Sequence, residues 1–401
     1  MFCNGFQYNI TGAILDNLKR EFHSSNVNIT LIQTPLSKFD SREIRIEKFS
    51  DTTTKKYRFP IFFAPPMSYL LDLLIGLLAI RSTVFVSFSP HVGYVALLMG
   101  KFNTALRLIH WSIDFSPQRF KNALLQRIYD FVDCRMFLKS HIHVDVSEPA
   151  LKARVIRYVK LEGNESALNR NRLVVRVGIP DDSVSLINLD NFYSKRVFFL
   201  GNLNPTVGID TFVYVAKEIA VRIPRASFHV IGNGSEFESA VLLSKLLGID
   251  ERFSWYGNLE KGEFEVLLKT ASVGLAPYKS EMGSFSQFAD PSKLKNYMQF
   301  AIPFVVTDVP LVVQELRVRN VGIVTANSVQ SIAHETIGLL QDRNLWSSQR
   351  TEIHEYAKTQ TWNTQLLQFK AIVCNFLFPE WVREALINGL VPYRYRINRC
   401  V

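Results

Sequence analysis

The sequence predicts an α/β protein built from two doubly wound domains, each with a parallel sheet flanked by helices. Three observations predict this architecture. At 401 residues the chain is long enough for two domains. Hydrophobic residues make up 47% of it and charged residues 20%, as in folded globular proteins. Short apolar runs alternate with amphipathic helical segments, most regularly in the second half, and this alternation is typical of parallel sheets.

The first half carries several strand-length apolar runs. No apolar strand precedes the amphipathic helix expected at Thr11–Phe22, so we expect the first strand to be missing or shortened by truncation. The run at Leu106–Trp111 leads into the segment Ser112–Pro117, and a helix is expected from about Pro117. Ligands bind at the carboxyl ends of strands in open α/β sheets, so this segment is a candidate site. The other strands predicted in this half are Asn28–Gln33, Tyr57–Phe63, Thr83–Ser89, His141–Val146 and Val174–Pro180.

The most apolar stretch of the chain is Phe59–Ile80. Pro65 and Pro66 interrupt it, and Asp72 falls near its middle. The uninterrupted part, Met67–Ile80, has only fourteen residues, whereas a bilayer needs roughly 20. The stretch therefore favours a buried or interfacial helix over a transmembrane one.

The positive charge of the chain lies in its first half. Residues 1–180 contain 24 Lys and Arg against 14 Asp and Glu, and residues 181–401 contain 22 of each. This asymmetry suggests an acidic partner for the first half, such as an anionic membrane surface, a pyrophosphate-linked acceptor or nucleic acid. A basic surface that only improves solubility is the alternative.

Cysteine usage and the N-terminus bear on the compartment. The opening residues lack the basic start and long apolar run of a secretory signal. The cysteines are scattered without metal-like spacing, which indicates reduced thiols and a cytoplasmic protein. They are Cys3, Cys134, Cys374 and Cys400.

The second half reads as a regular series of strands and helices. Glycine-containing turns, Gly201-Asn202 and Gly257-Asn258, follow two of its strands, and Tyr278 follows another. Free backbone amides at a strand-to-helix turn are suited to binding phosphate. The strands predicted here are Arg196–Leu200, Ala226–Ile231, Phe253–Tyr256, Val273–Pro277, Phe304–Thr307 and Gly322–Val324.

The segment Asp290–Val306 combines a loop, a short amphipathic helix and an apolar strand. Ser292 and the residues before it can cap the helix and leave its first amides open to an anion. Lys293 places a cation in the first turn, where the helix dipole favours negative charge, and a phosphate between the two would explain it. Asn296 and Tyr297 fall on the same helix face as Lys293. An ordinary helix with an exposed lysine is the alternative.

This segment resembles the nucleotide-sugar site of GT-B glycosyltransferases, where a pattern close to P-x-K-L-x-E-Y-M-x-x-G-x-P holds the donor. Asn296 stands where that family usually has a ribose-binding Glu, Ala301 replaces the usual Gly, and Phe288 stands in place of a partner Glu. The turn at Gly201 is similar to the family's strand-G-x-L-x-P-x-K-G motif, with Val207 at the Lys position. The residues that match the first pattern are Pro291, Lys293, Leu294, Tyr297, Met298 and Pro303.

The resemblance implies two Rossmann-like doubly wound domains facing a cleft. Residues 1–180 would bind the acceptor, residues 181–362 the nucleotide sugar, and residues 363–401 would form a helix and tail that pack back towards the first domain. The implied donor-binding residues are Gly201, Asn202, Gly257, Asn258, Tyr278, Ser292, Lys293, Asn296 and Tyr297.

Asp114 is the candidate catalytic base. The segment around it, IHWSIDFS, resembles the equivalent place in bacterial xanthan-type glucuronosyltransferases, where an aspartate is the proposed base. A base in the acceptor domain, together with the missing Glu pair, favours an inverting reaction. A helix cap for the helix expected near Pro117 is the alternative role for Asp114. His110 is interpreted as a strand residue facing the core or the cleft rather than as a catalyst.

The resemblance implies transfer of a sugar from a nucleoside-diphosphate sugar to a glycan or lipid-linked acceptor, as in bacterial surface polysaccharide synthesis. No cofactor and no obligatory metal are expected, because the family stabilises the leaving group with cations and a helix end. We expect a cytoplasmic protein, peripheral at the inner face of the cytoplasmic membrane, with no nucleic-acid partner. The alternative function is a non-catalytic nucleotide- or glycan-binding protein on the same fold.

Overall fold

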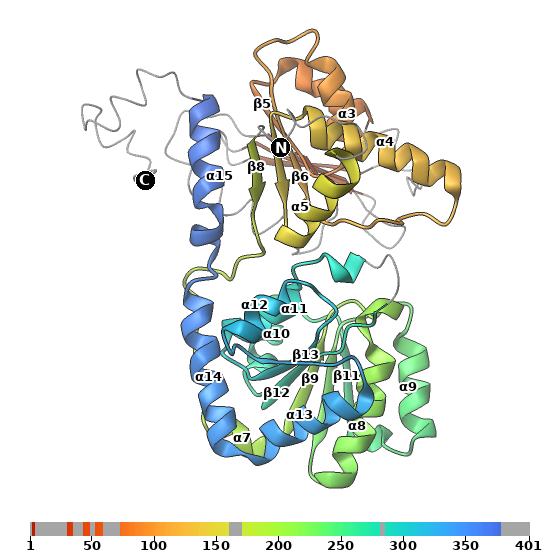
Figure 1. Cartoon of the computed structure of the whole chain (residues 1–401), viewed down its shortest axis with the longest axis vertical. Coiled ribbons are helices and arrows are strands. Elements are labelled where there is room, and N and C mark those ends of the chain that lie inside the picture. Colours follow the sequence, from red (N-terminus) through yellow and green to blue (C-terminus); the bar gives the residue numbers. More distant parts are fainter. Residues whose placement is uncertain are drawn as a thin grey trace, which may run out of the picture. The chain divides into compact units, whose positions relative to one another are not determined.

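The computed structural model describes residues 2–4, 30–34, 43–48, 53–58, 73–159, 171–280 and 285–377. The chain forms two compact units, Met1–Arg176 with Gln365–Val401, and Val177–Thr364. Each unit contains a largely or wholly parallel sheet with flanking helices (Figure 1). The predicted architecture of two doubly wound domains is therefore confirmed. The unit boundaries lie a few residues from the positions 180 and 362 expected from the sequence.

The sheet of the first unit has eight strands within the described residues, in the order β4-β3-β2-β1-β5-β6-β7-β8. At one edge β3 pairs antiparallel with both β2 and β4, and the other pairs are parallel. Their bounds are β1 Phe2–Asn4, β2 Thr30–Thr34, β3 Glu43–Lys48, β4 Thr53–Arg58, β5 Val84–Ser87, β6 Arg107–Ser112, β7 Ile142–Asp145 and β8 Asn171–Val174. The first strand is indeed short, and the helix expected at Thr11–Phe22 lies outside the described residues.

Two expected elements of the first half are placed differently. The strand expected at Val174–Pro180 is wrong, because β8 ends at Val174 and Ile179 instead exchanges backbone hydrogen bonds with Gln360 and Trp362. The Cα of Trp362 would lie 2.7 Å from a Cβ on Gly178, so only glycine fits this close approach. The strand expected at Tyr57–Phe63 overlaps the end of β4, which begins earlier, at Thr53, and residues 59–63 lie outside the described residues.

Among the described residues of the first unit, a short turn of helix runs from Leu73 and continues as η1 (Leu78–Arg81). The later elements are α3 (Pro90–Met99), α4 (Ala123–Lys139), α5 (Glu148–Arg154), the π-helical η2 (Val155–Val159) and most of α15 (Trp362–Leu377). In α15, the ring of Phe369 lies 4.8 Å from that of Trp111 on β6.

The described part of the stretch Phe59–Ile80 is a helix with one buried and one exposed face. Ile75 and Ala79 are buried, whereas Leu74 and Leu78 are 61% and 48% exposed. The described residues 73–81 thus form an amphipathic helix, with one face packed inside the protein. Within the described parts of the chain, no helix has both the length and the apolar character needed to cross a bilayer.

The second unit has a six-stranded parallel sheet within the described residues, in the order β11-β10-β9-β12-β13-β14. The strands are β9 Arg196–Leu200, β10 Ser227–Ile231, β11 Phe253–Gly257, β12 Val273–Ala276, β13 Phe304–Thr307 and β14 Ile323–Thr325. The helices are α7 Asn191–Ser194, α8 Ile209–Arg222, α9 Phe237–Leu246, α10 Lys261–Leu268, α11 Ser292–Gln299, α12 Val313–Val318, α13 Val329–Gln341 and α14 Arg343–Lys358 (Figure 1).

The core of this unit follows from the apolar runs read in the sequence. Val197, Phe198, Phe199 and Leu200 of β9 are all buried, as expected for a central strand that is covered on both faces. The chain winds from β9 towards β11 in one direction and from β12 towards β14 in the other. The winding therefore reverses between β9 and β12, and ligands bind at the carboxyl ends of the strands at such a point.

Candidate functional site

Three glycine turns meet at the carboxyl edge of the second sheet. Gly201 after β9 and Gly232 after β10 both have positive φ values, +119° and +133°. A Cβ on Gly232 would lie 1.9 Å from the carbonyl oxygen of Gly201, so the two backbones touch directly. The Gly232 amide donates to the carbonyl of Gly257, at 2.7 Å, which adds the turn after β11. The predicted turns at Gly201 and Gly257 therefore lie along one edge.

Lys293 of α11 lies at this edge too, near the point between β9 and β12 where the winding reverses, which we call the switch point. Its side chain is only 5% exposed, and its Nζ has no hydrogen-bond partner among the described residues. A Cβ on Gly201 would lie 3.9 Å from that Nζ, so the ammonium lies beside the turn after β9. The Nζ also lies 4.3 Å from the ring centroid of Phe199 and 4.7 Å from that of Tyr278.

The environment of Lys293 disfavours its charge. Burial lowers the pKa of this ammonium from 10.5 to about 7. A buried cation without a hydrogen-bonding anion is costly, so it needs a compensating function or partner. The interpretation of this residue as an exposed lysine on an ordinary helix is wrong. The sequence did not identify Phe199 as a neighbour of the ammonium, because its position in an apolar strand indicates only a core residue.

The N-terminus of α11 differs in detail from the prediction. The helix begins at Ser292, and Pro291 occupies the cap position without a side-chain cap. Ser292 is exposed and lies one position past the cap, so its hydroxyl does not cap the helix as expected. The first turn is therefore not closed by a side chain of its own cap residue, and its dipole favours an anion close to Lys293.

Tyr297 has a structural role rather than the predicted contact with the donor. It is fully buried, and its hydroxyl lies 3.1 Å from the carbonyl oxygen of Phe198 and 3.0 Å from that of Leu275. A Cβ on Gly274 would lie 2.6 Å from the Tyr297 ring, so the ring lies flat against the strand backbone. The residue fixes α11 onto β9 and β12, and Lys293 one turn earlier is thereby held at the sheet edge.

The remaining predicted donor residues lie in or near this region. Asn202 and Asn258 are exposed in the turns after β9 and β11, and Asn296 is half-buried on α11. Tyr278 is buried two residues after β12, and its carbonyl accepts from the Thr307 hydroxyl at 2.8 Å.

Asp290 is buried, and its carboxylate accepts from the amide of Val177 at 2.8 Å and lies 3.7 Å from Lys295 Nζ. These contacts give it a structural role. Glu281 lies outside the described residues. In the described parts of the chain, no group of three or more His, Cys, Asp and Glu side chains is arranged to hold a metal ion.

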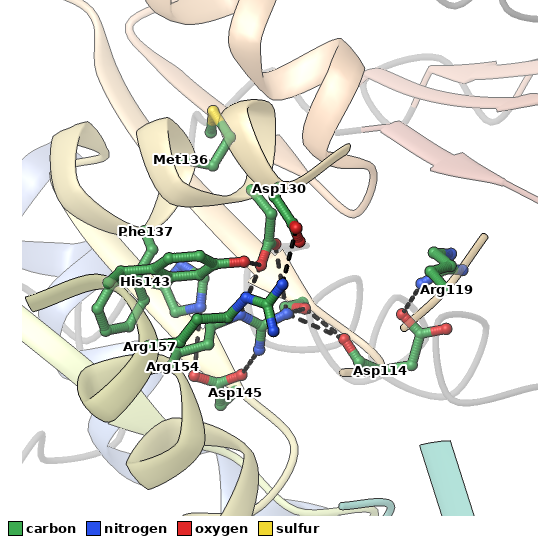
Figure 2. A network of polar contacts seen from close by, with 12 residues as sticks. Asp114, Arg119, Asp130, Met136, Phe137, His143, Asp145, Arg154 and Arg157 are labelled. Atoms are coloured by element: carbon green, nitrogen blue, oxygen red, sulfur yellow. Dashed lines mark hydrogen bonds and ion pairs between the residues drawn. The ribbon is translucent and has the colours of Figure 1, made fainter. Parts of the chain in front are cut away.

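In the first unit, Asp114 lies in the loop that follows β6. Its carboxylate accepts from Arg119 Nη1 at 2.8 Å, and both side chains are more than a third exposed, at 39% and 38% (Figure 2). The helix expected near Pro117 begins only at Ala123, and the Asn122 side chain caps it. Asp114 therefore does not cap a helix, and its alternative role is wrong.

His110 is a core residue, as expected. It is fully buried on β6, and its Nδ1 lies 3.2 Å from the carbonyl oxygen of Ser87. Burial, followed by the neighbouring His143, lowers the pKa of His110 to about 3, so the imidazole is neutral at physiological pH.

Sequence reasoning missed a buried ionic cluster below Asp114. Arg154 of α5 is fully buried between Asp133 of α4 and Asp145 of β7 (Figure 2). In the sequence, Arg154 is one of several basic residues in a helical segment, and no local signal distinguishes it from a surface residue.

The fold and this edge together define a class of protein. Two doubly wound units, with a phosphate-type turn and a buried lysine at the switch point of the second, are the architecture of GT-B glycosyltransferases. The family model of glycosyl transferases group 1 matches residues 190–360. The chain thus has the GT-B fold, and its second unit matches the family model of glycosyl transferases group 1. A comparison with curated proteins finds no match.

Solved structures support the same fold over nearly the whole chain. Sucrose-phosphate synthase from Thermosynechococcus elongatus is 12% identical, with a TM-score of 0.69 over 93% of this chain and 94% of that one. Anabaena HepE in complex with UDP and glucose is 11% identical, with a TM-score of 0.67 over 93% and 99%. The lipopolysaccharide outer core galactosyltransferase WaaB is 15% identical, with a TM-score of 0.61 over 94% and 99%. At these identities the likeness concerns the fold.

Proposed function

We propose that this protein transfers a sugar from a nucleoside-diphosphate sugar to a glycan or lipid-linked acceptor in bacterial surface polysaccharide synthesis. The observation that carries the proposal is the buried Lys293 ammonium, which lacks a partner among the described residues and lies beside Gly201 at the switch point. The names of similar structures support the substrate classes. HepE is described with UDP and glucose, a pneumococcal O-GlcNAc transferase with UDP and GlcNAc, and WaaB as a lipopolysaccharide galactosyltransferase.

The donor diphosphate would lie between Lys293, the first turn of α11 and the glycine turns. Cations and free amides at this place stabilise the charge that develops on the leaving diphosphate as the sugar is transferred. Val207 stands where the family motif has a second lysine, so Lys293 would be the lysine that contacts the diphosphate. Because Tyr297 and Phe199 hold the ammonium in position before the donor arrives, little reorganisation is needed when it binds.

Asp114 would act as the general base that activates the acceptor hydroxyl, and the reaction would invert the anomeric centre. The carboxylate is accessible, lies at the carboxyl end of a parallel strand and has no capping role. Its present partner, Arg119, would have to leave the Oδ1 atom when the acceptor hydroxyl takes that place. The freed guanidinium would then be available to an anionic group of the acceptor.

Peripheral attachment to an anionic membrane is a further part of the proposal. The first half of α4 exposes an apolar stripe, Leu124, Leu125, Ile128 and Phe131, whose exposed fractions range from 49% to 66%. Exposed Arg127, Arg135 and Lys139 lie on the same helix. Apolar residues next to basic ones suit a surface of anionic lipid, and the excess positive charge of residues 1–180 is on the same unit.

The test of the function is a screen of nucleotide sugars by thermal shift, followed by assays with the donor that stabilises. A bound donor stabilises the protein by mass action, so the true donor raises the melting temperature in a concentration-dependent way. Donor turnover is then measured with and without a lipid-linked glycan acceptor. The alternative of a non-catalytic binding protein predicts stabilisation by a nucleotide without turnover under either condition. Stabilisation by none of the nucleotide sugars would contradict the proposed function.

A further inference from the structure

We propose that Arg154 is a positioning residue, which clamps the segment from Ser112 to Phe115 from below and so fixes where Asp114 stands. The catalytic part of this inference rests on the proposed function of Asp114. The clamp itself does not, because it concerns the order of the segment whether or not the protein transfers a sugar.

The guanidinium contacts the segment at three points. Arg154 Nη2 donates to the Ser112 hydroxyl at 2.7 Å and to the carbonyl of Asp114 at 3.1 Å. The Ser112 hydroxyl in turn donates to the same carbonyl at 2.8 Å. The guanidinium carbon also lies 4.7 Å from the ring centroid of Phe115. The backbone of the first residues after β6 is thus held without any regular secondary structure.

The guanidinium is itself anchored on two other elements. Its Nε donates to Asp133 Oδ2 at 3.1 Å, and its Nη1 donates to Asp145 Oδ1. Tyr158 donates to Asp133 Oδ2 at 2.8 Å from the far side of the cluster. Burial would raise the pKa of the Asp133 carboxyl, but Arg154 lowers it, so the cluster is ionic. Arginine suits this role because its planar fork presents donors in several fixed directions.

The contacts of the segment divide into a buried and an exposed end. The Asp114 carbonyl faces the buried cluster, while its carboxylate points away to Arg119 and is 39% exposed (Figure 2). The guanidinium has five N–H donors, and the two carboxylates do not use all of them. Here one of the two terminal nitrogens of Arg154 makes its shortest contact with the segment that carries the candidate base. A small displacement of a catalytic group can lower a rate on the order of 100-fold, so such a clamp has catalytic value.

The test uses Ser112→Ala, which removes a loop contact and leaves the ion pairs of the cluster in place. We expect faster hydrogen exchange at the amides of residues 113–119 in this variant. Tyr158→Phe is the matched control, because it removes one hydroxyl from the opposite side of the same cluster. Ser112→Ala loses two hydrogen bonds and Tyr158→Phe loses one, so exchange at residues 113–119 is compared after correction for the global stability of each variant. Equal exchange of residues 113–119 in the two variants would overturn the clamp.

A double-mutant cycle tests the catalytic consequence. Ser112→Ala should lower kcat for transfer roughly 10- to 100-fold and leave the affinity for UDP unchanged, whereas Tyr158→Phe should keep kcat. In an Asp114→Asn background, Ser112→Ala should cause no further loss, because both changes act through the same carboxylate. Additive losses would overturn the positioning role. If Asp114→Asn itself leaves transfer unchanged, the proposed base is wrong, and the exchange experiment still decides the clamp.

Discussion

Replacing Lys293 with methionine should stabilise the protein and weaken the binding of its donor. Methionine has a similar length but no charge, so the substitution removes a buried ammonium that has no hydrogen-bond partner among the described residues. The pKa of Lys293 falls from 10.5 to about 7 on folding. At about 1.36 kcal/mol per pKa unit, the charge costs the folded state up to about 4 kcal/mol at pH 7. Chemical denaturation should show a gain of that order or smaller.

The sign of this effect depends on pH. Because folding lowers the pKa of Lys293, the unfolded chain binds more protons between about pH 7 and pH 10.5. The destabilisation that the Lys293 charge causes in the wild-type protein therefore decreases as the pH rises across this window. Lys293→Met has no such charge, so its gain in stability over wild type should be largest at or below pH 7 and should shrink as the pH rises.

The same variant should bind UDP more weakly by roughly 10- to 100-fold, because a charge-assisted hydrogen bond contributes about 1.5–3 kcal/mol. Isothermal titration calorimetry measures this loss directly. Lys295→Met is the matched control: it removes a second buried lysine of α11, but one that lies 3.7 Å from Asp290 and donates to Gln360. That variant should be destabilised and bind UDP normally. If Lys293→Met binds UDP as tightly as wild type does, the assignment of the diphosphate site is refuted.

Four further predictions concern other properties. The affinity for UDP should fall by up to about tenfold per pH unit above pH 7, because the diphosphate requires a proton on Lys293 that the free site loses there. Calorimetry in buffers of different ionisation enthalpy should detect proton uptake on UDP binding, and binding without proton uptake would contradict the prediction. Asp114→Asn should reduce transfer by about 10²–10⁴-fold and spare UDP binding. Proton NMR of the first product of the wild-type protein should show an inverted anomer, and a retained anomer would leave Asp114 without its role as the base. Ile128→Glu should weaken sedimentation with anionic vesicles, in a salt-sensitive manner, whereas Leu246→Glu on α9 of the other unit should not; equal effects would exclude the α4 stripe. Ala301→Gly should stabilise the protein by about 1 kcal/mol, since Ala301 has a φ of +53° that disfavours a Cβ; unchanged stability in denaturant would show that the strain is offset by the buried methyl group.

Part of the candidate donor site could be predicted from the sequence because its signals are local. The turn at Gly201 follows an apolar strand, and Lys293 opens a helix, so the alternation of elements alone brings both to the carboxyl edge of one sheet. The family pattern also marks the position of Ala301 as one that usually carries glycine. The structure explains this with a left-handed backbone at that residue.

Other assignments failed because they depend on how a helix is rotated against its sheet. Lys293 and Tyr297 share one face of α11, and their spacing alone cannot show that the tyrosine inserts below the strands while the lysine reaches the edge. Ser292 was expected to cap this helix, but a shift of a single residue in the helix start removes that role. The alternative role of Asp114 as a helix cap is wrong for the same reason, because the next helix begins only at Ala123.

The sequence by itself determined the two doubly wound units, the order of the second sheet's strands along the chain and the segments that carry glycine turns. These features follow from hydrophobic periodicity and turn chemistry, which act between near neighbours. Only the tertiary structure decided the environment of each charged group. Arg154 contacts residues that lie 9, 21 and 42 positions away in the chain. The burial that lowers the pKa of Lys293, and the clamp that holds Asp114, arise only when distant segments pack together, because burial and hydrogen-bond geometry are properties of the assembled core.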